Sequence, residues 1–447
     1  MPRGYTRRRF CAALLPALQL RERPNILWLV AEDNGPQWGC YGYPLVRTPV
    51  VDRLAAQGTQ FRNAFTTAPV CSPSRSAWNT GMYQTAIDAH HHRSHRGDGY
   101  RLPEGVRLVS ERLHDAGYFT ANVLAAAPGV MGTGKTDWNF AADRPFDGDH
   151  WNQRRPGQPF FAQVNFQATH KGPAFPEARR QRDPIDPARV ELPPYWPDHP
   201  VVRDEFANYL DCVNLLDSKI GRVLEAIEKD GLAQNTVVFF FGDNGRCLIR
   251  GKQWPYDAGI HVPLVVRWPG GGKPGTVRED LASAVDITAT TLWLAGAPLP
   301  ANLHGRPLFG PRAQPREAVF AARDRCDDTV DRIRAVRTAR YKLIRNYMPE
   351  RPYTQHNDYI ERQYPTLGAM KELWAQGKLR GAETLFMQPR KPPVELYDIR
   401  QDVHEVRNLA DSPAHRAELD SLNRRLDRWM GEADPTVAPP SDSGGGP

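Results

Sequence analysis

Residues 236–242 read Thr-Val-Val-Phe-Phe-Phe-Gly and are followed directly by Asp243-Asn244-Gly245. An apolar run this rich in β-branched and aromatic residues is typical of a buried strand. A second such run, residues 25–31 (Asn-Ile-Leu-Trp-Leu-Val-Ala), ends in Glu32-Asp33. In open α/β sheets, ligands bind at the carboxyl ends of the strands. The two runs therefore predict a sheet that carries polar groups at one edge.

Strands and helices alternate along the first 300 residues. The apolar patterns predict further strands at 118–124, 159–167 and 262–268. They predict helices at 48–57, 106–116, 206–229 (stopped by Gly231) and 286–295. This alternation indicates an α/β sandwich around a large, mostly parallel central sheet flanked by helices.

After about Pro315 the pattern changes. Residues 333–346 alternate around a turn, which predicts an antiparallel hairpin, and residues 414–430 predict a final helix ended by Gly431. We therefore expect a smaller C-terminal α+β subdomain with an antiparallel sheet over residues 316–433. The Pro-, Gly- and Ser-rich stretch 434–447 predicts a disordered tail.

Composition limits the possible partners. The 447 residues carry a net charge of +7, which suits an anionic ligand. No nucleic acid is expected, because the basic residues are scattered and no aromatic-interleaved stripe or known binding motif is present. The six cysteines show no C-x-x-C spacing, so neither a zinc ribbon nor a disulfide scaffold is indicated.

The first 22 residues resemble an export signal. Arg7-Arg8-Arg9-Phe10 precedes the apolar run 11–20, as in a twin-arginine leader, although a clear cleavage site is missing. The run is too short to span a membrane, so no stable membrane insertion is expected. These features predict a periplasmic or secreted protein. The alternative is a basic leader that carries no targeting signal, in a protein that stays in the cytoplasm.

The loop Cys71-Ser72-Pro73-Ser74-Arg75 carries the most specific motif. Cys-x-Pro-x-Arg arises by accident in about one chain of this length in fifty. Glu32-Asp33, this loop and Asp243-Asn244 all lie at or near predicted strand ends, and oxygen ligands from several strand ends suit Ca²⁺. A capped turn is the alternative for either acidic pair alone.

In order and combination, the motifs resemble those of the type I sulfatases of the alkaline phosphatase superfamily, most closely heparan N-sulfatase (sulfamidase) and its bacterial relatives. The resemblance runs from about Arg23 to Leu409. It rests on Arg-Pro-Asn-Ile-Leu (23–27), Phe-Arg-Asn-Ala-Phe (61–65), Cys-Ser-Pro-Ser-Arg (71–75), Gly134-Lys135, His170, Gly-Asp-Asn-Gly (242–245), Glu-Leu-Tyr-Asp (395–398) and Asn-Leu-Ala (408–410). It implies an alkaline-phosphatase-like fold with a sulfatase catalytic domain over residues 23–315.

The resemblance also implies cofactors. One Ca²⁺ would be held by Glu32, Asp33, Cys71, Asp243 and Asn244. Cys71 would be oxidised to formylglycine by a formylglycine-generating, or sulfatase-maturating, enzyme. Hydrated formylglycine would supply the hydroxyl that attacks sulfur. The family has Asp where this chain has Glu32, whose side chain is longer by one methylene.

The implied catalytic residues are Cys71, Arg75, Lys135, His170 and Lys252. Arg75 would hold the hydrated formylglycine, the two lysines would contact sulfate, and His170 would also contact sulfate and protonate the leaving group. The family has His two residues after the first lysine, where this chain has Asp137. We expect Asp137 to orient Lys135 or to face a leaving group.

The run His90-His91-His92-Arg93-Ser94-His95-Arg96 suits no compact zinc site. We expect His91, His92 and Arg93 to form a polar rim that contacts an acidic glycan. This run is equally compatible with an exposed loop that has no functional role.

The sequence thus predicts a sulfatase acting on sulfate esters or sulfamates of a sulfated saccharide, with heparin- or heparan-type glucosamine favoured. One alternative is a phosphonate or phosphate monoester hydrolase on the same fold. The other is a non-catalytic protein that binds sulfated glycans and keeps Cys71 unmodified.

Overall fold

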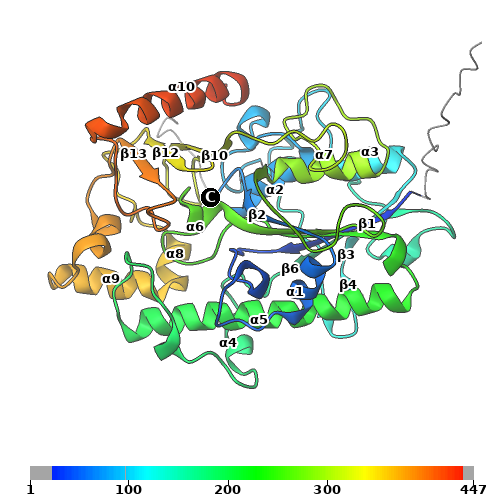
Figure 1. The fold of residues 1–447 in the computed structure, drawn as a ribbon, viewed down its shortest axis with the longest axis horizontal. Coiled ribbons are helices and arrows are strands. Elements are labelled where there is room, and N and C mark those ends of the chain that lie inside the picture. The colour runs from blue at the N-terminus through cyan, green and yellow to red at the C-terminus, as the bar shows by residue number, and fades with distance from the viewer. Residues whose placement is uncertain (1–22, 96, 436–447) are drawn as a thin grey trace, which may run out of the picture.

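The computed structural model describes residues 23–95 and 97–435. Its centre is a seven-stranded sheet with the spatial order β3-β6-β1-β7-β8-β2-β9 (Figure 1). The strands are β1 (Asn25–Ala31), β2 (Thr59–Phe65), β3 (Phe119–Val123), β6 (Phe160–Phe166), β7 (Thr236–Gly242), β8 (His261–Arg267) and β9 (Thr276–Ser283). All of them run parallel except β8, which is antiparallel to both of its neighbours. The predicted large, mostly parallel sheet is confirmed.

Helices cover both faces of this sheet (Figure 1). One face carries α1 (Pro49–Ala56), α4 (Ala174–Arg179) and α5 (Pro200–Lys229); the other carries α2 (Cys71–Thr80), α3 (Val109–Asp115) and α7 (Val285–Leu294). Successive side chains of β1 point to opposite faces, as a strand requires. Leu27 and Leu29 pack into the core under α5, while Trp28 packs edge-on against Trp78 of α2. The central strands are therefore buried on both sides.

A second, four-stranded antiparallel sheet lies beside the first, with α10 (Arg416–Ala433) packed on it. Its strands are β10 (Val319–Arg323), β11 (Ile333–Arg337), β12 (Tyr341–Asn346) and β13 (Val394–Asp398). The Ala322 N–H donates to the Thr67 carbonyl at 2.9 Å, which ties this sheet to the chain after β2. The predicted antiparallel C-terminal sheet is confirmed, and the boundary at residue 315 stays a prediction.

The remaining elements are short. They are β4 (Ala125–Ala127), β5 (Val130–Met131), α6 (Asp257–Ile260), α8 (Asp358–Gln363), α9 (Pro365–Ala375) and the 3₁₀ helices η1 (Gly39–Tyr41), η2 (Gln84–Ile87), η3 (Trp151–Gln153), η4 (Pro187–Arg189), η5 (Ala233–Asn235), η6 (Gly381–Met387) and η7 (Pro413–His415).

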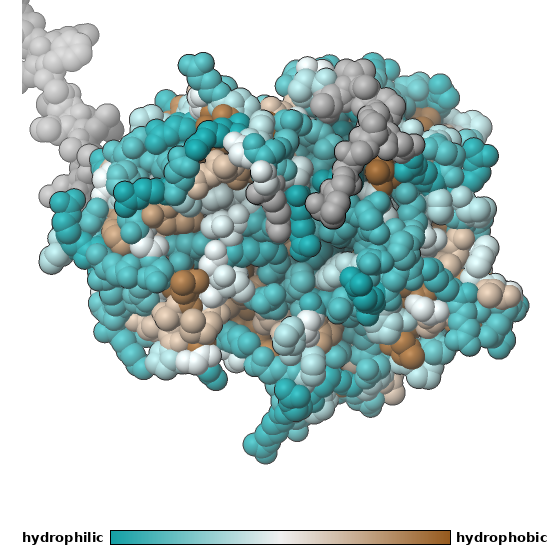
Figure 2. Space-filling model, turned by 180° about the vertical axis from the view of Figure 1, so that it is seen from behind, coloured by the Kyte–Doolittle hydropathy of each residue, from teal (hydrophilic) through white to brown (hydrophobic). Residues whose placement is uncertain are grey.

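Figure 2 shows a mostly hydrophilic surface on one side of the molecule, with small, separate hydrophobic patches. No helix in the described part of the chain is both long and apolar enough to cross a membrane.

Several boundaries differ from the prediction. Helix α5 begins at Pro200 rather than at residue 206, because His199 Nδ1 accepts the Val201 N–H at 3.3 Å and a proline suits the first turn. Gly431 does not end α10, which continues to Ala433. Asp434, predicted to begin the tail, is buried and pairs with Arg334. The leader (1–22) and residues 436–447 lie outside the described residues.

Candidate active site

The two strands with acidic ends are neighbours. β1 and β7 run parallel, and Ala31 pairs with Gly242 at their carboxyl ends. A Cβ atom on residue 242 would lie 2.5 Å from the Asn34 carbonyl oxygen, so this close approach needs glycine. The Asn34 N–H donates to the Asn244 carbonyl at 2.8 Å. The loops that follow the two strands are therefore joined, and their acidic residues meet at one edge of the sheet.

The carboxylates at this edge are fully buried and linked to one another. The backbone N–H of Asp33 donates to Asp243 Oδ1 at 2.8 Å, and Asn244 Nδ2 donates to Asp33 Oδ1 at 2.9 Å. Asp33 has a left-handed backbone with a φ of 53°, which is uncommon outside glycine and marks a constrained position. The convergence of these groups agrees with the sequence prediction.

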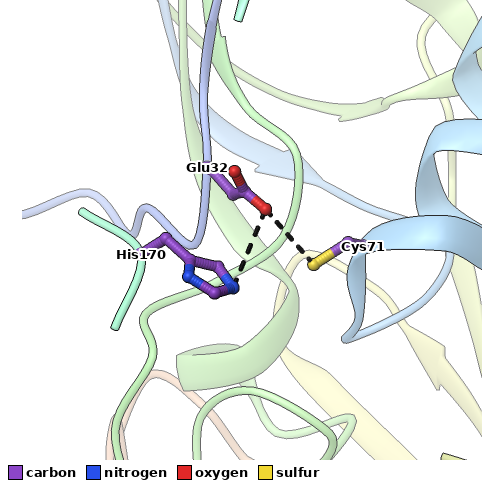
Figure 3. A group of neighbouring side chains, drawn as sticks. All are labelled: Glu32, Cys71 and His170. Atoms are coloured by element: carbon purple, nitrogen blue, oxygen red, sulfur yellow. Dashed lines mark hydrogen bonds and ion pairs between the residues drawn. The ribbon is translucent and has the colours of Figure 1, made fainter. Parts of the chain in front are cut away.

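Cys71 is the first residue of α2, and its sulfur faces the carboxylates. Cys71 Sγ lies 3.8 Å from Glu32 Oε1 (Figure 3) and 3.8 Å from Asp33 Oδ1. The prediction that the 71–75 stretch is a loop is wrong, because it forms the start of a helix. Pro73 is tolerated there, since N–H groups in the first helical turn have no partner within the helix.

Arg75 follows Cys71 by about one helical turn and therefore lies on the same side of α2. It is fully buried; its Nε donates to Asp243 Oδ2 at 2.9 Å and its Nη1 donates to Asn165 Oδ1 at 2.7 Å. The carboxylate of Asp243 neutralises the guanidinium and the amide oxygen of Asn165 satisfies a further N–H, which allows Arg75 to remain charged inside the protein. Arg75 thereby connects α2 to the ends of β6 and β7.

Two lysines and a histidine complete the cluster. Lys135 forms an ion pair with Glu32, and Lys252 Nζ donates to Asp33 Oδ2 at 2.8 Å. His170 follows β6, and its Nε2 lies 3.8 Å from Glu32 Oε1 (Figure 3) and 3.7 Å from Asp33 Oδ2. The structure therefore brings together all the residues for which the resemblance implies catalytic or metal-binding roles.

The cluster shifts the pKa values of its members. Burial alone would raise the pKa of Glu32, but Lys135 and Arg75 outweigh it and lower that pKa to about 2. Burial lowers the pKa of His170, and the charge of Lys252 adds to this effect, so the ring is neutral at pH 7. Burial raises the pKa of the Cys71 thiol to about 11. The unmodified sulfur is therefore protonated at neutral pH.

The donor set fits a hard cation. Asn244 Oδ1 is buried and has no hydrogen-bond partner within the described chain, although such an oxygen costs on the order of 1–3 kcal/mol when left unpaired. It belongs to the same cluster as three buried carboxylates. Carboxylate and amide oxygens are the ligands that Ca²⁺ prefers. Glu32, Asp33, Asp243 and Asn244 could therefore hold such an ion next to residue 71.

A cavity of about 610 Å³ opens onto this cluster. It is lined by Glu32, Arg93, His95, Gly99, Thr133, Lys135, Thr136, Asp137, Trp138, Phe140, Ala141, Gln167 and His170. Asp137 Oδ2 lies 3.4 Å from Lys135 Nζ, as expected for a carboxylate that orients this lysine. The Arg93 side chain is half exposed at the rim. The cavity is large enough for a saccharide unit and presents both charges and aromatic rings.

His91 and His92 do not form the expected polar rim, although His95 of the same run lines the cavity. His92 is buried and His91 is partly buried, and neither lines the cavity. His91 Nδ1 accepts the Arg325 N–H at 3.3 Å, and His92 Nδ1 lies 2.9 Å from Asp327 Oδ1. These contacts draw His91 and His92 inward onto the C-terminal part of the chain. A substrate role for either histidine stays a prediction.

Comparison with known proteins identifies the family. The sequence matches the family described as Sulfatase over residues 24–297, which is more than half of the chain. The chain belongs to the sulfatase family. A second match, described as the C-terminal region of N-sulphoglucosamine sulphohydrolase, covers residues 248–361 of this sulfatase. The predicted family and enzyme class, a sulfuric ester hydrolase or sulfamidase, are confirmed.

Two curated relatives of this sulfatase span most of its length. An ulvan-active sulfatase of Formosa agariphila is 34% identical, over 92% of this chain and 76% of the relative. The N-sulphoglucosamine sulphohydrolase of Homo sapiens is 29% identical, over 96% of this chain and 95% of the relative.

Solved structures share the fold of this sulfatase. One, in complex with its substrate D-glucosamine-2-N,6-O-disulfate, superposes with a TM-score of 0.66 at 17% identity, over 93% of this chain and 99% of the other. A phosphonate monoester hydrolase from Silicibacter pomeroyi superposes with a TM-score of 0.65 at 18% identity, over 94% and 98%. At these identities the likeness concerns the fold.

Two further residues of the sulfatase touch the site without having been predicted. Asn165 accepts a hydrogen bond from Arg75. In the sequence, Asn165 could have been noticed as a polar residue within the apolar run 159–167. The ring of Tyr359 lies 5.3 Å from Lys252 Nζ and 6.0 Å from the His170 ring. Tyr359 lies in α8, which comes between β12 and β13 in the sequence. No local sequence pattern distinguishes it from the other aromatic residues in 351–364.

Proposed function

We propose that this sulfatase removes sulfate, bound as an ester or a sulfamate, from a sulfated glycan, and that heparin- or heparan-type glucosamine is the favoured unit. The position of Cys71, whose sulfur lies 3.8 Å from two buried carboxylates beside a saccharide-sized cavity, carries this proposal. The C-terminal match to N-sulphoglucosamine sulphohydrolase supports glucosamine. The ulvan-active relative supports the wider class of sulfated polysaccharides.

The charge balance of the cluster supports a bound divalent cation. Its charged groups are the carboxylates Glu32, Asp33, Asp137 and Asp243 and the cations Arg75, Lys135 and Lys252. Four negative groups against three positive groups would repel an anionic sulfate. One Ca²⁺ reverses the sign, and when bound it would offset the charge of the sulfate oxygens. We assign Glu32, Asp33, residue 71, Asp243 and Asn244 as its ligands.

Residue 71 would act in an oxidised form. We propose that a formylglycine-generating enzyme converts Cys71, since a thiol with a pKa of about 11 is a poor nucleophile at pH 7. Hydrated formylglycine would supply the attacking oxygen. Asp243 and Asn165 hold the Arg75 guanidinium in place. We propose that Arg75 contacts the converted side chain at residue 71.

The other residues act on the substrate. Lys135 and Lys252 are available to offset the charge that builds up on the sulfate oxygens, because both ammonium groups already point into the cluster. His170 Nδ1 lies 2.8 Å from the Lys171 carbonyl, which favours a proton on Nδ1 and turns Nε2 toward the site. Nε2 would take up a proton beside the anionic substrate and donate it to the leaving oxygen or nitrogen.

We also propose that the leader over residues 1–22 directs export through the twin-arginine route, so that the enzyme acts in the periplasm or is secreted. Cell fractionation of the full chain and of a variant with Arg8 and Arg9 replaced by lysine tests this proposal. Equal distribution of both proteins in the cytoplasm would contradict it.

The substrate proposal is tested with protein made with and without a formylglycine-generating enzyme. Peptide mass spectrometry measures conversion at residue 71, and activity is measured on N-, 2-O-, 3-O- and 6-O-sulfated glucosamine saccharides and on ulvan fragments. We expect desulfation in proportion to conversion, and none for Cys71→Ala, which should still fold. Faster hydrolysis of 4-nitrophenyl phosphate or phosphonate than of the sulfate would overturn the substrate class. Activity in fully unconverted protein would overturn the role of residue 71.

A further inference from the structure

Lys252, the proposed sulfate contact, lies in a short loop with a constrained backbone. Two residues before it, Arg250 has a φ of 66°, and Gln253, directly after it, has a φ of 79°. Residues other than glycine rarely adopt this left-handed region and stay there only when their surroundings hold them. A Cβ atom at Gly251 would lie 2.4 Å from the Arg246 carbonyl oxygen, so the loop is also closely packed. Contacts outside the loop must therefore maintain its shape.

The Arg250 side chain supplies such contacts. Its Nη1 donates to the His404 carbonyl at 2.6 Å, and its Nη2 donates to the Glu405 carbonyl. The buried guanidinium also lies against two aromatic rings, 4.6 Å from the Tyr195 centroid and 3.7 Å from the Tyr256 centroid. Lysine could not replace it, because binding two acceptors while stacking on rings needs the planar fork of arginine.

The groups that receive Arg250 are themselves fixed. Glu405 has a φ of 55°, its carboxylate accepts the first N–H of α6 at 2.7 Å, and it pairs with Lys342 Nζ at 2.8 Å. The Tyr256 ring is held by its hydroxyl, which donates to Glu395 Oε2 at 2.8 Å. Glu395 begins the Glu-Leu-Tyr-Asp motif, to which the proposed function gives no role. The C-terminal part of the chain thus offers a rigid anchor.

Direct contact between Arg250 and the substrate is the alternative. Within the described part of the chain, the lining of the cavity of about 610 Å³ does not include Arg250, which lines a separate cavity of about 270 Å³. Lys252, in contrast, directs its ammonium into the cluster, 2.8 Å from Asp33 Oδ2. The Gln253 N–H donates to the Pro69 carbonyl at 2.7 Å, just before α2. The loop therefore connects the C-terminal anchor to the site, and Arg250 acts on it from behind.

We propose that Arg250 is a positioning residue for Lys252. By binding the carbonyls of His404 and Glu405, it holds the loop so that the Lys252 ammonium stays against the sulfate oxygens. This inference rests on the proposed function, in which Lys252 contacts sulfate, and it gives the C-terminal part of the chain a share in that contact. Without Arg250 the constrained loop relaxes, and a misplacement of about 1 Å in a site of this kind costs up to about 10²-fold in rate.

A double-mutant cycle on the converted enzyme tests the proposal. With conversion of residue 71 matched by mass spectrometry, Lys252→Met should lower kcat on 4-nitrophenyl sulfate by about 10²-fold or more. Arg250→Met should lower kcat by about tenfold in the wild type. When residue 252 is already Met, the same change should lower kcat by less than about twofold, because the two residues act as one unit.

Two further variants complete the cycle. Arg250→Lys keeps the charge but lacks the fork, so it should behave like Arg250→Met and replaces it in the cycle if that variant does not fold. Arg203→Lys is the matched control, since Arg203 on α5 also donates to a carbonyl, that of Val190 at 3.0 Å, and its replacement should leave kcat unchanged. Losses at residues 250 and 252 that multiply, an unchanged kcat in both Arg250 variants, or failure of both to fold would overturn the proposal.

Lysine acetylation of the unconverted protein gives a readout that is independent of turnover. The buried Lys252 should react slowly with acetic anhydride in the wild type and several-fold faster in Arg250→Met, as measured by peptide mass spectrometry. Lys391, which is buried and paired with Asp331, should react slowly in both proteins. Equal rates at Lys252, or a parallel rise at Lys391, would overturn the proposal. If converted wild-type enzyme hydrolyses none of the sulfates, the proposed function fails, whereas the effect of Arg250 on Lys252 is still measured.

Discussion

Arg75 and Asp243 form a buried ion pair in which Arg75 Nε lies 2.9 Å from Asp243 Oδ2, and solvent reaches neither side chain. The pair joins the helix that begins with Cys71 to the loop that follows β7. Removing one partner of such a pair leaves an uncompensated charge in the interior, which is strongly destabilising. The pair therefore couples the stability of the protein to the integrity of its active site.

We expect Asp243→Ala to lower the free energy of unfolding by about 3–5 kcal/mol, as measured by urea denaturation, because Arg75 loses its partner. Arg75→Met combined with Asp243→Ala should be less destabilising than the sum of the two single changes. Asp143→Ala is a matched control, since it removes an exposed pair with Arg101 at 2.8 Å and should change the free energy of unfolding far less. Additive effects at residues 75 and 243 would contradict the coupling.

Calcium should stabilise the protein through the orphaned oxygen of Asn244. After removal of metals with EDTA, added Ca²⁺ at about 100 times its Kd should raise the free energy of unfolding by about 2.7 kcal/mol, seen as a higher Tm. Asn244→Ala should weaken this response because one ligand oxygen is lost. Asn423→Ala, on α10, should respond like the wild type. An equal shift in all three proteins would show that Ca²⁺ binds elsewhere.

The thiol of unconverted Cys71 should react slowly with iodoacetamide. Only the thiolate reacts, and burial raises the thiol pKa to about 11, so the alkylation rate in EDTA should rise about tenfold per pH unit from pH 7 to 10. Mass spectrometry of the peptide that contains residue 71 measures the rate. In urea-unfolded protein the rate should level off near the ordinary pKa of about 8.5. A plateau below pH 9 in the folded protein would refute this assignment.

Arg93 should affect large anionic substrates more than small ones. Its side chain lies at the cavity rim, so Arg93→Ala should raise KM for a multiply sulfated saccharide by about fivefold, equivalent to about 1 kcal/mol, while kinetics on 4-nitrophenyl sulfate stay unchanged. Arg47→Ala, an exposed arginine elsewhere, is the control. Equal changes with both substrates would indicate that Arg93 acts on the catalytic cluster itself.

The fold could be predicted where hydrophobic runs are strong. β1 and β7 were identifiable because each is a continuous apolar run that ends in acidic residues, but their pairing is seen only in the structure. Helix α2 could not be identified in the same way. Its ten residues are all buried, yet the sequence Cys-Ser-Pro-Ser-Arg-Ser-Ala-Trp-Asn-Thr has little helical periodicity, because the helix is surrounded by protein on all sides.

The site was predictable to the extent that its residues belong to family motifs. Cys71, Lys135, His170 and Lys252 come from separate segments, and only the resemblance indicated that they meet. The inward turn of His92 could not be predicted, since it depends on contacts with Arg325 and Asp327, more than 230 positions later in the chain. Asn165 was visible as a polar residue in an apolar strand, but its partner was not.

The burial of Cys71 limits when another enzyme can reach its side chain. With 2% of its surface exposed, at the first residue of a helix enclosed by the core, this side chain is out of reach of any second enzyme once the chain has folded. The oxidation proposed above would therefore have to take place before the chain folds. On this proposal a copy that folds with an unconverted thiol could not be converted afterwards, so the ratio of active to inactive enzyme would be set at synthesis.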